Sequence, residues 1–106
     1  MVMIFASEKA RTQLLEEGCV YTVRTRPHRE GFDWATDKRG SKKICDIHIQ
    51  LRAQLALCDL ENTLPRYLHG SGFASVREWI DEIHGLNKEL PPSVRVYRVI
   101  KMSSRP

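Results

Sequence analysis

Two periods of hydrophobic residues run along the chain, one typical of helices and the other of strands. The helical period is clearest in the last third, where apolar residues recur at spacings of three and four; they are Val76, Trp79, Ile80 and Ile83. Ser75, with Glu78 three positions later, matches a capping box and predicts the start of this helix. Gly85 is its expected end. Because Trp79 shares the apolar face, we expect it in the core.

The same two periods predict elements along the rest of the chain. In order, these are a strand at 3–6, a helix at 8–17, a strand at 20–26, a long strand pair at 44–57, a short helical turn at 60–67 and a strand at 94–102. Ser7 is the expected N-cap of the first helix, and Gly18 is its expected left-handed end. Residues 28–43 show neither period, so we expect a long loop there.

The strand period is clearest at 45–57, where apolar residues occupy the odd positions and polar residues most of the even ones. This alternation predicts one buried face and one solvated face. Strands and helices in this order predict the α+β fold class, with a small curled sheet or pseudo-barrel of about five or six strands and two main helices. At 106 residues, the chain is expected to form a single domain over 1–106.

The composition, 42% hydrophobic and 28% charged, is that of an ordinary globular protein. No apolar run approaches the roughly 20 residues of a membrane span, and no signal-peptide pattern opens the chain. Three cysteines at irregular spacing suit a reducing compartment. We therefore expect a cytoplasmic protein with no membrane partner and, by default, a monomer. The net charge of +4 favours an anionic partner.

Several short motifs occur together in this chain. Residues 72–79 read Gly-Phe-x-Ser-x-x-Glu-Trp and precede a helix, a proline-containing loop and a closing strand whose residues 96–100 read Val-Tyr-x-Val-Ile. Near the N-terminus, a helix is followed by Gly18 and by a strand that reaches Arg24. This order resembles the ASCH family, a branch of the PUA-like RNA-binding fold.

The resemblance implies a PUA-like pseudo-barrel whose ligand cleft is bordered by Arg24, with Thr22 as a further polar cleft residue. The chain departs from the family pattern at Cys19 and Val20, where family members usually carry lysines. Some ASCH proteins resemble amidohydrolases or ribonucleases, whose chemistry would use a lysine or another base. The replacement of those lysines favours a binding protein over an enzyme, and we assign no catalytic residue.

Basic residues outnumber acidic ones between positions 22 and 43, a segment that also holds two aromatic residues. The predicted RNA-binding residues are Arg24, Arg26, Arg29, Trp34, Lys38, Arg39, Lys42 and Lys43. The cations would contact phosphates, and Trp34 or Phe32 would stack on an unpaired base. The alternative is a solvated loop that these two aromatic residues pin to the core. The expected partner is RNA or a nucleotide-like ligand, with no cofactor.

Two other classes of function stay open. One is a hydrolase that acts on a modified nucleoside, such as acetylated cytidine, or on RNA. The other is an interaction adaptor whose acidic helix at 75–86 docks a basic protein. Cys45 and His48 would lie on opposite faces of a strand, so we expect no metal site. We expect His28 to be a simple surface residue.

Overall fold

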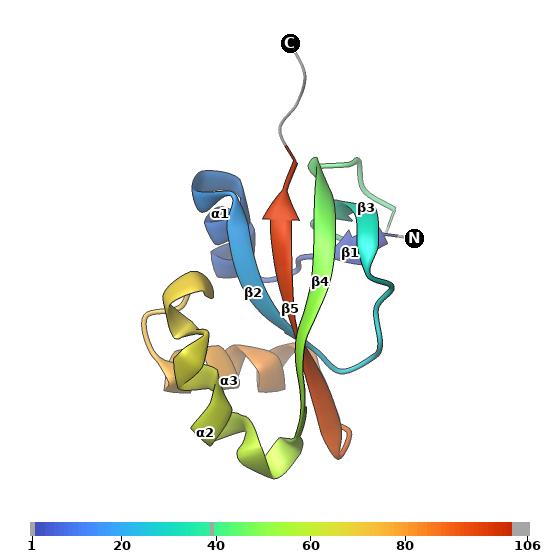
Figure 1. Cartoon of the computed structure of the whole chain (residues 1–106). Coiled ribbons are helices and arrows are strands. Elements are labelled where there is room, and N and C mark those ends of the chain that lie inside the picture. Colours follow the sequence, from blue (N-terminus) through green and yellow to red (C-terminus); the bar gives the residue numbers. More distant parts are fainter. Residues whose placement is uncertain (1, 39, 103–106) are drawn as a thin grey trace.

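A mixed five-stranded β-sheet forms the centre of the fold, in a computed structural model that describes residues 2–38 and 40–102. In spatial order, its strands are β1 (Val2–Ile4), β3 (Gly31–Thr36), β4 (Cys45–Ala56), β5 (Ser93–Lys101) and β2 (Cys19–Arg24) (Figure 1). β1 and β3 are parallel, and the other neighbours are antiparallel. The sheet curls into half a barrel, which confirms the predicted α+β class.

Helices flank the two ends of this sheet. α1 (Glu8–Glu17) packs beside β2, whereas α2 (Leu60–Thr63) and α3 (Val76–Leu86) lie together near its other end (Figure 1). The predicted helical turn at 60–67 is a series of short turns in which α2 alternates with 3-10 segments; these are Leu57–Asp59, Leu64–Arg66 and Leu68–Gly70. The two main helices expected from the sequence are thus α1 and α3.

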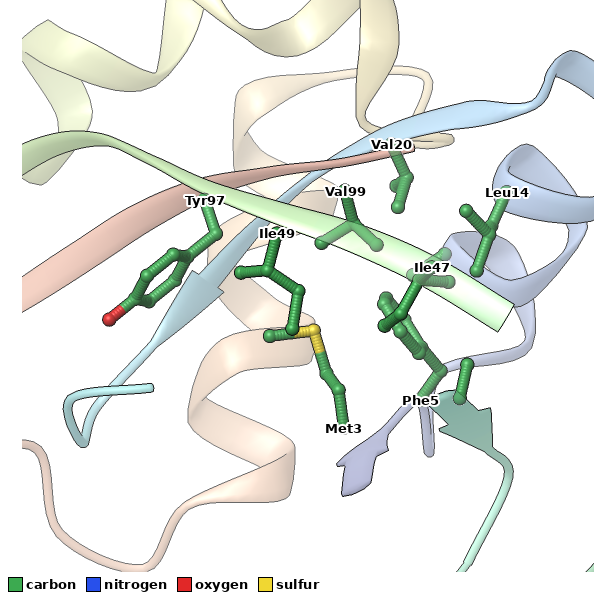
Figure 2. Close-up of a cluster of buried hydrophobic side chains, with 10 residues drawn as sticks. Met3, Phe5, Leu14, Val20, Ile47, Ile49, Tyr97 and Val99 are labelled. Atoms are coloured by element: carbon green, nitrogen blue, oxygen red, sulfur yellow. The ribbon is translucent and has the colours of Figure 1, made fainter. Parts of the chain in front are cut away.

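Buried side chains form two clusters, one on each face of the sheet. The first fills the inside of the curl, beneath α1, and includes Met3, Phe5, Leu14, Val20, Ile47, Ile49, Tyr97 and Val99. Figure 2 shows these side chains pointing toward one another from β1, α1, β2, β4 and β5. The second lies against α2 and α3 and includes Leu55, Leu60, Leu64, Phe73, Trp79, Ile80, Ile83, Val94 and Val96. Trp79 is 3% exposed, so its predicted place in the core is confirmed.

A β-bulge in β4 explains how one strand serves both clusters. Leu51 pairs with Tyr97, but Ala53 pairs with Val96, its neighbour along β5. Because adjacent residues of β5 point to opposite faces, this shift moves the odd positions of β4 to the other face. The buried positions Ile47, Ile49 and Leu55 follow the predicted alternation, but the prediction that they share one core face is wrong. Ile47 belongs to the first cluster and Leu55 to the second.

Three of the predicted helix caps, Ser7, Gly18 and Ser75, are present. The Ser7 hydroxyl accepts a hydrogen bond from the Ala10 amide, and Gly18 ends α1 at a φ of 78°. The Ser75 hydroxyl accepts from the Glu78 amide at 3.1 Å, which confirms the start of α3. The Glu78 carboxylate forms an ion pair with Lys9, so this residue ties α3 to α1.

Two sequence predictions about loops and ends need correction. The segment 28–43 is not one long loop, because its middle, Gly31–Thr36, is strand β3. The alternation there was hard to see, since Phe32, on the outward face, is itself a large apolar residue and is 78% exposed. The second correction concerns α3, which continues through Gly85 to Leu86.

Gly72 and Gly85 offer a matched test of this arrangement. Gly72 has a φ of +88°, and a Cβ there would overlap the carbonyl of Lys9 on α1. We expect Gly72→Ala to lower the free energy of unfolding by more than about 2 kcal/mol, from backbone strain and overlap. Gly85 lies within α3, and no atom is close to the position that a Cβ would occupy there. Gly85→Ala should therefore raise stability by about 0.5–1 kcal/mol. Urea denaturation of both variants measures the difference, and equal effects would contradict the packing described.

Candidate functional site

The open side of the half-barrel lies between its two edge strands, and the side chain of Arg24 spans it. Arg24 is the last residue of β2, and its Nη1 donates a hydrogen bond of 2.6 Å to the carbonyl of Ile4, the last residue of β1. The guanidinium carbon also lies 4.8 Å from the centre of the Phe5 ring. These contacts hold the two edges of the sheet together, since the strands themselves are not hydrogen-bonded neighbours.

A cleft of about 440 Å³ opens beside this contact. Its walls come from β1, the end of β2 and the residues that follow it, the start of α1 and the end of α3. Polar side chains that line it are Ser7, Thr22, Arg24, Thr25, Arg26, His28 and Asn87. Its volume falls within the range of sites that bind small molecules or single nucleotides.

The electrostatics of the cleft centre on Arg24. Its Nε is buried and has no hydrogen-bond partner within the described part of the chain. Burial lowers the pKa of Arg24 to about 10, an effect that Tyr97 partly opposes, so the guanidinium is still charged at neutral pH. No aspartate or glutamate is among the described residues that line the cleft. A buried cation without a counter-charge is costly, and a bound anion would offset that cost.

The start of α1 adds to the positive electrostatic potential in the cleft. Ser7 and Ala10, its N-cap and a first-turn residue, both line the cleft. The unpaired amides at a helix N-terminus carry partial positive charge, which favours anions nearby. Together with the half-buried guanidinium of Arg24, they make the cleft suited to a group such as phosphate.

Thr22 and His28 are positioned by a single buried residue, Tyr97. Thr22 is 8% exposed and pairs directly with Tyr97 across β2 and β5. The Tyr97 hydroxyl accepts from the His28 amide at 2.7 Å and donates to the His28 carbonyl at 3.2 Å. These bonds fix the turn that follows β2. His28 is therefore half-buried in the cleft wall, with its Nε2 atom 3.4 Å from the Val2 carbonyl. The expectation that His28 is a simple surface residue is wrong, because its backbone is bonded to Tyr97, a residue 69 positions away that no local pattern reveals.

The other predicted RNA-binding residues divide into separate groups. Arg26 is exposed at the rim of the cleft, and Arg29 is exposed in the connection before β3. Three lysines follow β3 at its other end, about 17 Å away along the strand; they are Lys38, Lys42 and Lys43, all exposed. Arg39 lies outside the described residues. The structure thus brings Thr22, Arg24 and Arg26 to one cleft and leaves the lysines apart from it.

Trp34 and Phe32 also lie outside the cleft, on β3. Trp34 is half-buried, and Phe32 is 78% exposed. Since they are two residues apart in a strand, their side chains share a face of the sheet, opposite the buried Ala35. Phe32 does not pin this segment to the core.

Cys19, one of the two positions where the chain departs from the ASCH pattern, is half-buried at the start of β2 and is not among the cleft residues. In the part of the chain that the structure describes, no three His, Cys, Asp or Glu side chains gather closely enough to hold a metal ion. Among residues 2–38 and 40–102, no helix is both long and apolar enough to cross a membrane.

Comparisons of this chain with protein-family models, with curated proteins and with solved structures found no match. Its function is therefore argued from the cleft and the surface around it.

The cysteines allow a test of the burial and charge described. Burial raises the pKa of the Cys45 thiol, with a smaller rise from Asp46 and partial opposition from Lys101 and Lys43. Cys58 is exposed. Because only the thiolate reacts, we expect iodoacetamide at about pH 7.5 to modify Cys45 roughly tenfold more slowly than Cys58. The rate at Cys45 should still rise as the pH passes 9, which peptide mass spectrometry can follow. Equal rates at the two cysteines would contradict this environment.

Proposed function

We propose that this protein binds RNA and holds one nucleotide of it in the cleft beside Arg24. The observation that carries the proposal is the charged, half-buried side chain of Arg24 in a cleft of about 440 Å³ that has no carboxylate among its described residues. An anion that enters the cleft would offset the cost of burying this charge. A phosphate of RNA supplies that anion, and charge-assisted hydrogen bonds from arginine to phosphate are among the stronger ones in proteins.

The remaining cleft residues suit the rest of a nucleotide. Val2, Ile4 and Leu86 give an apolar wall against which a base can pack. The Thr22 hydroxyl and the Asn87 side-chain amide, which also line the cleft, offer hydrogen-bonding groups for the base or ribose. In this arrangement the phosphate contact supplies most of the affinity, and the base contacts supply the preference for sequence.

The resemblance to the ASCH family supports the same site. Arg24 and Thr22 are the residues that this resemblance places at a ligand cleft, and both line the cleft described here. On this proposal the chain is a PUA-like RNA-binding protein, and its net charge of +4 suits that partner.

The cleft favours binding over hydrolysis. Neither a lysine nor a carboxylate is among its described residues, so His28 is the one side chain there of a type that commonly acts as a general base. Cys19 is not part of the cleft wall. For the adaptor hypothesis, the exposed Asp81 already has an ion-pair partner in Arg77 at 3.6 Å. We therefore propose a binding protein.

Removing the charge of Arg24 tests the proposal. Arg24→Met keeps much of the side-chain length, and we expect the affinity for a short single-stranded RNA to fall at least about tenfold, through loss of a charge-assisted hydrogen bond. Fluorescence polarisation with a labelled RNA measures the affinity. Arg77→Met is the matched control, because Arg77 is an exposed arginine on α3 that does not line the cleft.

Arg24→Met also removes the contact with Ile4, so its fold must be checked by circular dichroism at the assay temperature. Thr22→Val, a nearly isosteric change, gives a second variant that keeps this contact, and its affinity should fall about two- to tenfold. If both variants fold and bind RNA as tightly as the unchanged protein, the proposal is wrong.

A nucleoside 5′-monophosphate should be enough to occupy the cleft. At a concentration of ten times its Kd, it should add about 1.4 kcal/mol to the stability of the protein, a rise in Tm of about 4–8 °C. Differential scanning fluorimetry measures the shift. The nucleoside without phosphate should give a much smaller shift, and Arg24→Met should abolish the difference between the two. A nucleoside that stabilises as well as its monophosphate would contradict a phosphate site at Arg24.

A further inference from the structure

A second surface, outside the cleft, carries one exposed aromatic side chain and a half-buried one beside it. Phe32 on β3 is 78% exposed, and its ring centre lies 4.8 Å from that of His48 on β4, in an edge-on arrangement. Trp34, two residues along the same strand, shares this face and is half-buried. A large apolar ring this exposed, with a half-buried aromatic neighbour on the same face, suits a binding surface.

This face continues into the cleft through β1. Val2 pairs with Trp34 in the parallel ladder of β1 and β3, so the two side chains lie next to each other on the same face. Val2 also lines the cleft. Neighbouring strands are about 4.8 Å apart, and Phe32 lies about 7 Å beyond Trp34 along β3. A chain that leaves the cleft over Val2 therefore meets Trp34 and then Phe32.

The charges around this face are complementary to a phosphate backbone. Arg98 pairs with Gln50 on the same face and is half-buried beside Cys19, and Arg29 is exposed in the connection just before β3. Two nearby carboxylates already have partners. Asp46 forms an ion pair with Lys43 at 3.0 Å, and Glu30 accepts a hydrogen bond of 2.7 Å from the Leu51 amide. The cations that remain favour an anionic partner.

We infer that the face formed by Phe32, Trp34 and His48 is a stacking surface for unpaired bases of a single-stranded RNA whose neighbouring nucleotide occupies the cleft. This inference rests on the proposed function and extends it from a mononucleotide site to a longer one. Bases stack on flat aromatic rings with little regard to sequence, while cations beside the rings contact the phosphates. A duplex cannot use this face, because its bases are already stacked on one another.

Substitution of the most exposed ring separates this surface from the cleft. Phe32→Ala should lower the affinity for a single-stranded RNA of about eight nucleotides by about tenfold. The same variant should bind a nucleoside monophosphate as tightly as the unchanged protein does. Phe32→Trp, which keeps a stacking ring, should retain the affinity for the longer RNA. Leu15→Ala is the matched control, because Leu15 is an exposed apolar residue on α1, away from this face.

The fluorescence of Trp34 gives an independent readout. Trp79 is 3% exposed in the core, so a Trp79→Phe background leaves Trp34 as the reporter. The longer RNA should quench its emission through stacking, and a monophosphate held in the cleft should not. Quenching by both ligands, or by neither, would overturn the inference.

The outcomes distinguish the two proposals. If the monophosphate and the longer RNA bind, but Phe32→Ala weakens neither, the cleft proposal stands and the stacking surface is wrong. If neither ligand binds the unchanged protein, the proposed function fails, and the stacking surface fails with it. If sedimentation shows a dimer that Phe32→Ala dissociates, the face is a contact between two copies of this chain, and the inference is overturned.

Discussion

The hydrogen bond from Arg24 to the carbonyl of Ile4 is the contact on which the rest of the site depends. A curled sheet of five strands is too small to close by strand pairing alone, and its two edges would otherwise stay apart. Here the side chain of Arg24 joins the two edge strands, and its Nε is buried without a described hydrogen-bond partner. The closure of the fold and the affinity for an anion are thus two results of the same side chain.

The elements that the sequence predicted well are those fixed by local interactions. α1 begins at Ser7 and ends at Gly18, and α3 begins at Ser75, because each of these residues acts on backbone groups within a few positions. The burial of Trp79 followed from its position on one helical face. None of these predictions required knowledge of a distant part of the chain.

The features that the sequence did not predict depend on distant partners. β3 forms because Phe32 and Trp34 pair with β4 and β1, and its outward face lacks the polar residues that reveal a strand. The position of His28 depends on Tyr97, which lies 69 residues away. The segment 22–43 seemed a single basic surface in sequence, but β3 divides it. The assignment of Arg24 to a cleft came from a family resemblance, not from periodicity.

The bulge in β4 has a consequence for how this protein can vary. One extra residue, at Arg52, decides which half of the strand faces which cluster of the core. A regular ladder through the same residues, without the bulge, would turn Ala53 and Leu55 to the face of Ile47 and Ile49 and Gln54 toward the second cluster. Deletion of Arg52 itself would leave Leu51 opposite Tyr97 and Ala53 opposite Val96, because these two pairs flank it. Over many generations, this strand should therefore tolerate a change in length at the bulge more readily than at its other positions.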